Sequence, residues 1–130
     1  KEIRRQQIRN IFFLDYLPSG FEAKDYDVSC NKDGSVRLWV KENKEGYDLY
    51  IGGKGGVKAP KNCRALFCGF DGVEQIKFQK NFKTENVKNM CGMFAGCCSL
   101  ETLDLSNFDT GNVLDMSRMF SDCTQLKKYI

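Results

Sequence analysis

The sequence contains no histidine, no long apolar run, only two prolines and a single tryptophan among its 130 residues. Without histidine the chain lacks the usual base of Ser-His and Cys-His catalytic pairs and the commonest nitrogen ligand of metal sites. A membrane-spanning helix needs about 20 mostly apolar residues in succession, and no stretch approaches that length. We therefore expect no enzyme, no cofactor and no membrane insertion.

An excess of one charge sign is also missing from most of the chain. The 20 basic and 17 acidic residues give a net charge of +3. Lys1, Arg4, Arg5 and Arg9, set against Glu2, account for this whole excess, so the remaining residues are balanced. Nucleic-acid-binding domains usually carry a basic face over the domain. The composition thus favours one domain without a nucleic-acid partner.

Cysteine is plentiful, but its spacing fits no common site. The seven cysteines form no C-x2-C pair, and their odd number does not suit a complete disulfide framework: Cys30, Cys63, Cys68, Cys91, Cys97, Cys98 and Cys123. We expect no metal site and mostly reduced, buried thiols. Cys91 and Cys98 are the expected exposed thiols, because they lie off the apolar pattern described next.

An internal repeat dominates the second half of the chain. Residues 82–106 and 108–130 align at an offset of 26, and a degenerate earlier copy begins near Cys63 at an offset of 27. The chain therefore holds about two and a half copies, with the last one expected to be truncated. The positions identical in the two clear copies are Phe82/Phe108, Thr84/Thr110, Asn86/Asn112, Val87/Val113, Met90/Met116, Met93/Met119, Phe94/Phe120, Cys97/Cys123 and Leu100/Leu126.

Each repeat divides into two halves. The first half has the apolar spacing of one helix face, which predicts a short core helix: Val87, Met90, Met93, Phe94 and Cys97. Asn112, with Asp115 three residues later, has the spacing of a helix N-cap, and Asn86 keeps that cap upstream. The second half, Leu100, Leu103 and Leu105, has the L-x-x-L-x-L pattern of a leucine-rich-repeat strand.

These residues carry a family resemblance. The string LDLSNFDTGNVLDMSRMFSDCTQL resembles the 26-residue leucine-rich repeats of BspA-like and Mycoplasma-lipoprotein-type proteins. The resemblance implies a right-handed solenoid with parallel strands. It also implies a bacterial cell-surface or secreted protein that engages host or neighbouring-cell macromolecules, and it carries no catalytic residues. A cytoplasmic location stays open.

The first half of the chain predicts a small β-rich cap. Residues 11–14 form an apolar run typical of a buried strand, and Asp33-Gly34 is a hairpin signal between residues 26–30 and 35–41. Residues 47–51 predict a further strand, and the glycine-rich residues 52–56 are interpreted as a flexible connection rather than a phosphate loop. We thus expect an α/β fold, with an antiparallel cap over residues 1–58 and a leucine-rich-repeat solenoid over residues 59–130.

Two sets of side chains are candidate ligand contacts. Trp39 alternates with inward residues and would share an outer face with Arg37 and Lys41, unless it packs against the strand at 11–14 or the linker. The exposed strand-side positions of the repeats form the second set, Glu101, Asp104, Lys127 and Lys128. These sets predict a recognition module that binds a protein or a glycan.

The sequence leaves two other functions open. A structural spacer, or a domain that self-associates through the open C-terminal edge, is the alternative. An enzyme would need a cysteine nucleophile or a carboxylate pair drawn from Asp104 and Asp109, and only Lys and Arg could serve as activating neighbours.

Overall fold

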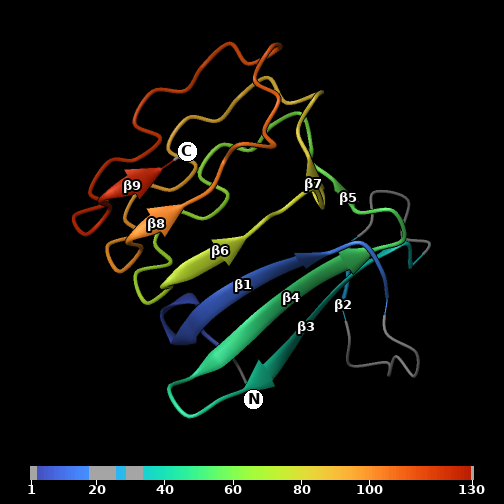
Figure 1. Cartoon of the computed structure of the whole chain (residues 1–130), viewed down its shortest axis with the longest axis vertical. Helices are drawn as coiled ribbons and strands as arrows, with labels where there is room; N and C mark the ends of the chain where they lie inside the picture. The colour runs from blue at the N-terminus through green and yellow to red at the C-terminus, as the bar shows by residue number, and fades with distance from the viewer. Residues whose placement is uncertain (1–2, 18–25, 29–33, 130) are drawn as a thin grey trace.

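A mixed five-stranded sheet forms one side of the molecule and three stacked coils form the other (Figure 1). The computed structural model describes residues 3–17, 26–28 and 34–129. The sheet has the order β2-β3-β4-β1-β6, and its strands are β1 (Ile8–Leu14), β2 (Tyr26–Asp27), β3 (Val36–Glu42), β4 (Tyr47–Gly53) and β6 (Gln75–Lys77).

Strand β1 lies in the interior of this sheet. It pairs in parallel with β4 through Ile11↔Leu49 and with β6 through Ile11↔Ile76. Ile11 is fully buried and Phe13 nearly so, which explains the apolar run that predicted a buried strand. The expected antiparallel cap is wrong as a whole, because β1 pairs in parallel and makes the sheet mixed, although the strands predicted around the hairpin, β2, β3 and β4, do pair in antiparallel. Asp33 and Cys30 lie outside the described residues.

The expected helices are absent from the part of the chain that the structure describes, where the only helix is a single 3-10 turn, η1 (Arg5–Gln7). Residues 62–70, 89–97 and 115–123, here called the first, second and third coil, form successive turns with N–H to O=C bonds between residues three apart, as from Met93 to Met90 and from Cys97 to Phe94. The predicted α/β leucine-rich solenoid of strands and helices is therefore wrong.

Backbone geometry explains why turns form where a helix was predicted. Each coil has two residues with positive φ, which no α-helix permits: Ala65 and Gly69, Gly92 and Gly96, Arg118 and Asp122. In place of the expected N-caps, the structure has Asx turns. In each turn the side-chain oxygen of Asn62, Asn89 or Asp115 accepts a hydrogen bond of 2.8–2.9 Å from the backbone N–H two residues later. Asn112 instead donates its side-chain amide to the Glu85 carbonyl.

Backbone hydrogen bonds join neighbouring coils. Alternate N–H groups of the first coil donate to carbonyls of the second, as from Cys63 to Asn89, and those of the second donate to the third, as from Met90 to Asp115. The repeats are thus stacked in parallel, and short parallel strands pair beside the coils: β5 (Val57–Lys58) with β7 (Phe82–Lys83), and β8 (Thr102–Leu103) with β9 (Lys128–Tyr129).

The apolar positions of the second copy form the core, as predicted, whereas Met116 in the last copy and Leu66 in the first are exposed. Val87, Met90, Met93, Phe94 and Cys97 are all fully buried. The Phe94 ring stacks on Phe67 of the first coil and on Phe120 of the third, with centroid distances of 5.5 and 5.8 Å. Because β6 also pairs with β1, the core runs without a break from the sheet into the coils.

The glycine-rich segment between sheet and coils is an ordered turn. Gly52 and Gly53 are buried at the end of β4, the Gly55 N–H donates to the Asp15 carbonyl, and the Gly56 N–H donates to Gly53. Gly55 and Gly56 have φ of +78° and +102°, values that favour glycine. The segment therefore does not behave as the flexible connection that its composition predicts.

Candidate functional site

The outer face of the sheet holds the predicted residues Trp39 and Arg37. Along β3, Val36, Leu38 and Val40 pack against the core, so the residues between them face outward. Trp39 thus lies on the same face as Arg37 and Lys41, one of the two environments that the sequence left open for it.

Three aromatic side chains lie side by side on this face and are called the aromatic row. Trp39, Tyr50 and Phe12 are register partners on β3, β4 and β1. Tyr50 stacks on Trp39 with ring centroids 5.5 Å apart and on Phe12 at 5.2 Å. Lys41 places its ammonium over the Tyr50 ring, 5.5 Å from the centroid. The Trp39 ring also lies against Gly52 at the end of β4, beside Leu14, so the alternative environment, packing on the linker and the strand at 11–14, fits the structure too.

A polar network flanks the aromatic row. Asp48 accepts hydrogen bonds of 2.8 Å from the side-chain amides of Asn10 and Asn43. Gln75 in turn donates to the Asn10 side chain at 2.9 Å, which continues the network from β4 across β1 to β6. Burial, followed by the Asp48 charge, raises the pKa of Tyr50, so its hydroxyl stays protonated at neutral pH.

The same face continues to the repeats. Phe12 pairs with Lys77 on β6, and Lys77 lines a cleft of about 290 Å³ together with Asp104, which follows β8. Hydrogen bonds from Ser106 hold the pKa of Asp104 below its ordinary value. Trp39 and Asp104 therefore stand at opposite ends of one outward surface, with Lys77 between them.

The remaining predicted residues lie further along the repeats. Glu101 lines a polar cleft of about 610 Å³ with Glu74, and its carbonyl accepts a bond from the exposed Lys127. Lys128 lies in β9 opposite Thr102, and its side chain is outside what the structure describes. The structure thus gathers Glu101 and Lys127 but does not bring them next to Trp39.

Sequence reasoning missed Phe12 and Lys77 as members of this face. Phe12 belongs to an apolar run interpreted as wholly buried, yet it lies between the buried residues Ile11 and Phe13 and is only half-buried. The two-residue alternation of a strand was the available signal.

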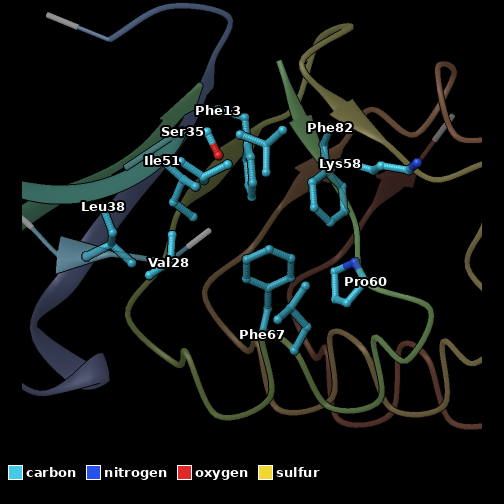
Figure 2. Close-up of a pocket in the computed structure, with 12 residues that line it drawn as sticks. Phe13, Val28, Ser35, Leu38, Ile51, Lys58, Pro60, Phe67 and Phe82 are labelled. Atoms are coloured by element: carbon cyan, nitrogen blue, oxygen red, sulfur yellow. The ribbon is translucent and has the colours of Figure 1, made fainter. Parts of the chain in front are cut away.

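An apolar groove of about 460 Å³ lies on the opposite side of the sheet, where it faces the first coil (Figure 2). The buried rings of Phe13, Phe67 and Phe82 line it, while Val28 and Leu66 are 44% and 39% exposed at its edge. The other lining residues are Ser35, Val36, Leu38, Ile51, Val57, Lys58 and Pro60.

The cysteines serve the packing of the coils. Burial raises the pKa of Cys63 to about 11 and that of Cys97 to about 12, which makes both poor nucleophiles at neutral pH. Cys91 and Cys98, the expected exposed thiols, are half-buried. Among the described residues, no group of three Cys, Asp or Glu side chains could hold a metal ion.

The candidate carboxylates are turn-forming residues. Asp104 accepts a bond from the Ser106 N–H, and Asp109 accepts one from the Gly111 N–H, both at 2.9 Å. A general acid needs a carboxyl whose pKa is raised, whereas that of Asp104 is lowered. These contacts give the pair a local structural role.

Residues 58–130 match a family model described as Mycoplasma protein of unknown function, DUF285. No curated protein and no solved structure matches the chain. Within the described ranges, no helix has the length and apolar character needed to cross a membrane.

Proposed function

The chain belongs to the DUF285 family of Mycoplasma proteins of unknown function, and we propose that it is a non-catalytic recognition module of a bacterial surface or secreted protein. The finer assignment to the BspA-like surface proteins is part of this proposal. It rests on the repeated string that ends in MFSDC, since the match itself names only the broader family.

One observation carries the proposal, namely the continuous outer surface from Trp39 through Tyr50 and Phe12 to Lys77 and Asp104. Half-buried aromatic side chains provide rigid contact area at low entropic cost, and charges at one end fix the orientation of a partner. Such a surface suits the binding of a partner and requires no catalytic residue.

The packing of the aromatic row favours a protein ligand over a glycan. Tyr50 stacks on Trp39 and on Phe12, with interplanar angles of 10° and 23°, and the Lys41 ammonium lies over the Tyr50 ring. A sugar ring would need a free aromatic face on which to lie, and these three neighbours already contact the Tyr50 ring. A protein partner can instead contact ring edges and the neighbouring Lys77 and Asp104.

The other function classes fit the side chains less well. Buried thiols of raised pKa and turn-bound carboxylates do not supply a nucleophile or a general acid. Two of the basic N-terminal residues are engaged by the protein itself, because Arg5 donates to the Cys68 carbonyl at 2.7 Å and Arg9 to the Glu45 carbonyl at 3.1 Å. Partners within the chain for these two guanidinium groups do not favour a nucleic-acid partner.

A binding screen with matched variants tests the proposal. The intact chain would be probed against protein and glycan collections, and each partner found would be titrated with the variants Trp39→Ala, Lys77→Glu and Asp104→Lys. We expect each variant to weaken binding about tenfold or more. Lys88→Glu, which makes the same charge change on an exposed residue away from this face, is the control. Unchanged binding in all three variants would refute the proposal.

Self-association is the second candidate, and the third coil favours it. Leu114, directly before the third coil, is 84% exposed and Met116 within it is 46% exposed, so two large apolar side chains face solvent close together in the sequence. Sedimentation equilibrium should then show a dimer that Leu114→Glu dissociates. A monomer at every concentration would exclude this function and leave the first untouched.

A further inference from the structure

Exposed lysines form a basic surface where the strands β5 and β7 lead into the coils. This surface is called the lysine face, and its members are Lys58, Lys61, Lys83 and Lys88. Lys58 on β5 and Lys83 on β7 are register partners. Each follows a buried residue, Val57 or Phe82, so both lysine side chains lie on the outer side of the two strands. Figure 2 shows the Lys58 nitrogen directed away from the buried rings accordingly.

Backbone pairing also brings the other two lysines together. Lys61 and Lys88 directly precede the first and the second coil, and the Lys88 N–H donates to the Lys61 carbonyl at 2.8 Å. Neighbouring parallel segments lie about 4.8 Å apart, and like charges on adjacent segments repel each other. The lysine face therefore consists of two like-charged pairs, each made by neighbouring repeats.

This concentration of charge is not neutralised by the protein. Within the part of the chain that the structure describes, none of the four ammonium groups has an ion-pair partner. Residues 54–64 contain four basic residues and no acidic one, and residues 80–88 contain three basic residues and one acidic residue, Glu85. Folding thus gathers on one surface more positive charge than the +3 of the whole chain, and an anionic partner would relieve the repulsion.

From this arrangement we propose that the lysine face binds a sulfated polysaccharide, at a site separate from the aromatic row. A linear polyanion can contact both lysine pairs at once. A protein partner would need apolar anchors, and no large apolar side chain is exposed within residues 57–62 and 82–89. A single-stranded nucleic acid would need aromatic rings on which its bases stack, and the one aromatic residue of these two segments, Phe82, is buried.

The lysine face ends at the second repeat. Asp109 and Leu114 occupy in the third repeat the positions of Lys83 and Lys88 in the second. The Leu114 N–H donates to the Lys88 carbonyl at 2.8 Å, so position 114 continues the column of Lys61 and Lys88. Because the Leu114 side chain is 84% exposed, Leu114→Lys would extend the face by one repeat without disturbing the core.

Isothermal titration of the intact chain with heparin tests the proposal. Four ammonium groups would displace about four counterions, so the affinity should fall on the order of a hundredfold between about 50 and 200 mM salt. Hyaluronan, which carries carboxylates but no sulfate and has a lower charge density, should bind about tenfold more weakly or less. Absence of heparin binding at low salt, or equal affinity for the two polysaccharides, would overturn the proposal.

Charge-reversal variants with a matched control locate the site. Lys58→Glu and Lys83→Glu should each weaken heparin binding about tenfold. Lys44→Glu makes the same change in the turn between β3 and β4 and should keep the affinity within about twofold. Leu114→Lys should strengthen binding about threefold, whereas Leu114→Glu should weaken it. All four positions are exposed, so circular dichroism should show every variant folded.

Two further results would contradict the assignment. Equal loss of heparin affinity in Lys44→Glu and in Lys83→Glu would show a response to net charge rather than to the lysine face. Tighter binding of polyglutamate or of single-stranded DNA than of heparin would indicate an acidic protein or a nucleic acid as the partner. Heparin is titrated apart from any partner of the aromatic row, for which Lys88→Glu is the control, so failure here leaves the proposed function untouched.

Discussion

The thiol of Cys97 donates a hydrogen bond to the carbonyl oxygen of Phe67 in the neighbouring coil, with an Sγ to O distance of 3.2 Å. Cys123 makes the same contact one repeat later, to the Phe94 carbonyl at 3.0 Å. The equivalent cysteines therefore link successive coils, and their regular spacing reflects the packing of the coils rather than a catalytic or metal-binding role.

Removing this contact should lower stability. Cys97 is fully buried, so Cys97→Ala leaves a small cavity and removes one of the two hydrogen bonds to the Phe67 carbonyl, which keeps the bond from the Phe70 N–H. We expect a cost of about 1–3 kcal/mol in the free energy of unfolding. Urea denaturation followed by circular dichroism measures the change. Cys91→Ala, at a half-buried position, should cost less than Cys97→Ala, and an equal or larger loss there would contradict the assigned role.

The buried thiols also predict a loss of stability at high pH. Burial raises the folded-state pKa of Cys63 to about 11 and of Cys97 to about 12, above the value of about 8.5 in an unfolded chain. Stability from these groups is complete below the unfolded pKa and falls as the pH rises towards the folded values.

Urea midpoints between pH 7 and 10.5 measure that loss, and the wild type should decline more steeply above about pH 9 than Cys63→Ala/Cys97→Ala. Parallel slopes for the two proteins would show that other groups cause the decline. Under native conditions both thiols should react with a thiol reagent more slowly than Cys91 and Cys98.

Arg5 should anchor the N-terminus to the first coil. Its guanidinium donates to the Cys68 carbonyl at 2.7 Å and lies 5.6 Å from the centroid of the Phe70 ring. Because the contact is exposed, we expect Arg5→Ala to cost only about 1 kcal/mol in the free energy of unfolding. Lys80→Ala, at another exposed cation, is the control for loss of charge. An equal decrease in the free energy of unfolding in the two variants would show that the loss of charge, and not the loss of the contact with the first coil, causes the effect.

Much of the repeat could be predicted from the sequence, because buried positions carry apolar residues at a regular period. Met90, Met93 and Cys97 fall at fixed positions of a 26-residue period, and all three are buried. Their secondary structure could not be predicted, since a spacing of three residues suits both a helix face and a run of turns bonded between residues three apart. Arg118 and Asp122, which adopt positive φ, give no local signal of that conformation.

The outer surface was predicted only in part, for a different reason. Alternation along β3 places Trp39 outward, and this follows from local sequence alone. That Phe12 lies beside Tyr50 depends on the parallel pairing of β1 with β4, between segments far apart in the chain. No local pattern encodes such a pairing, so the aromatic row emerges only from the structure.

Substitutions at Gly92 can distinguish the observed turns from the helix that the spacing predicted. Its φ is +63°, and an added Cβ would meet only the Ala95 Cβ at 3.9 Å, so space is not limiting there. In the observed coil Gly92→Ala should destabilise the protein by about 1 kcal/mol through backbone strain, and Gly92→Val by more.

In a helix the sign would be opposite, because alanine is favoured over glycine there by about 1 kcal/mol. Thermal and urea unfolding of wild type, Gly92→Ala and Gly92→Val measure this sign directly. Arg118→Gly, at the equivalent position of the third coil with φ of +57°, should be stabilising or neutral, since glycine adopts that backbone without strain. Stabilisation by Gly92→Ala would contradict the coil, whereas opposite effects at Gly92 and Arg118 would establish a left-handed backbone as the shared requirement of the repeat.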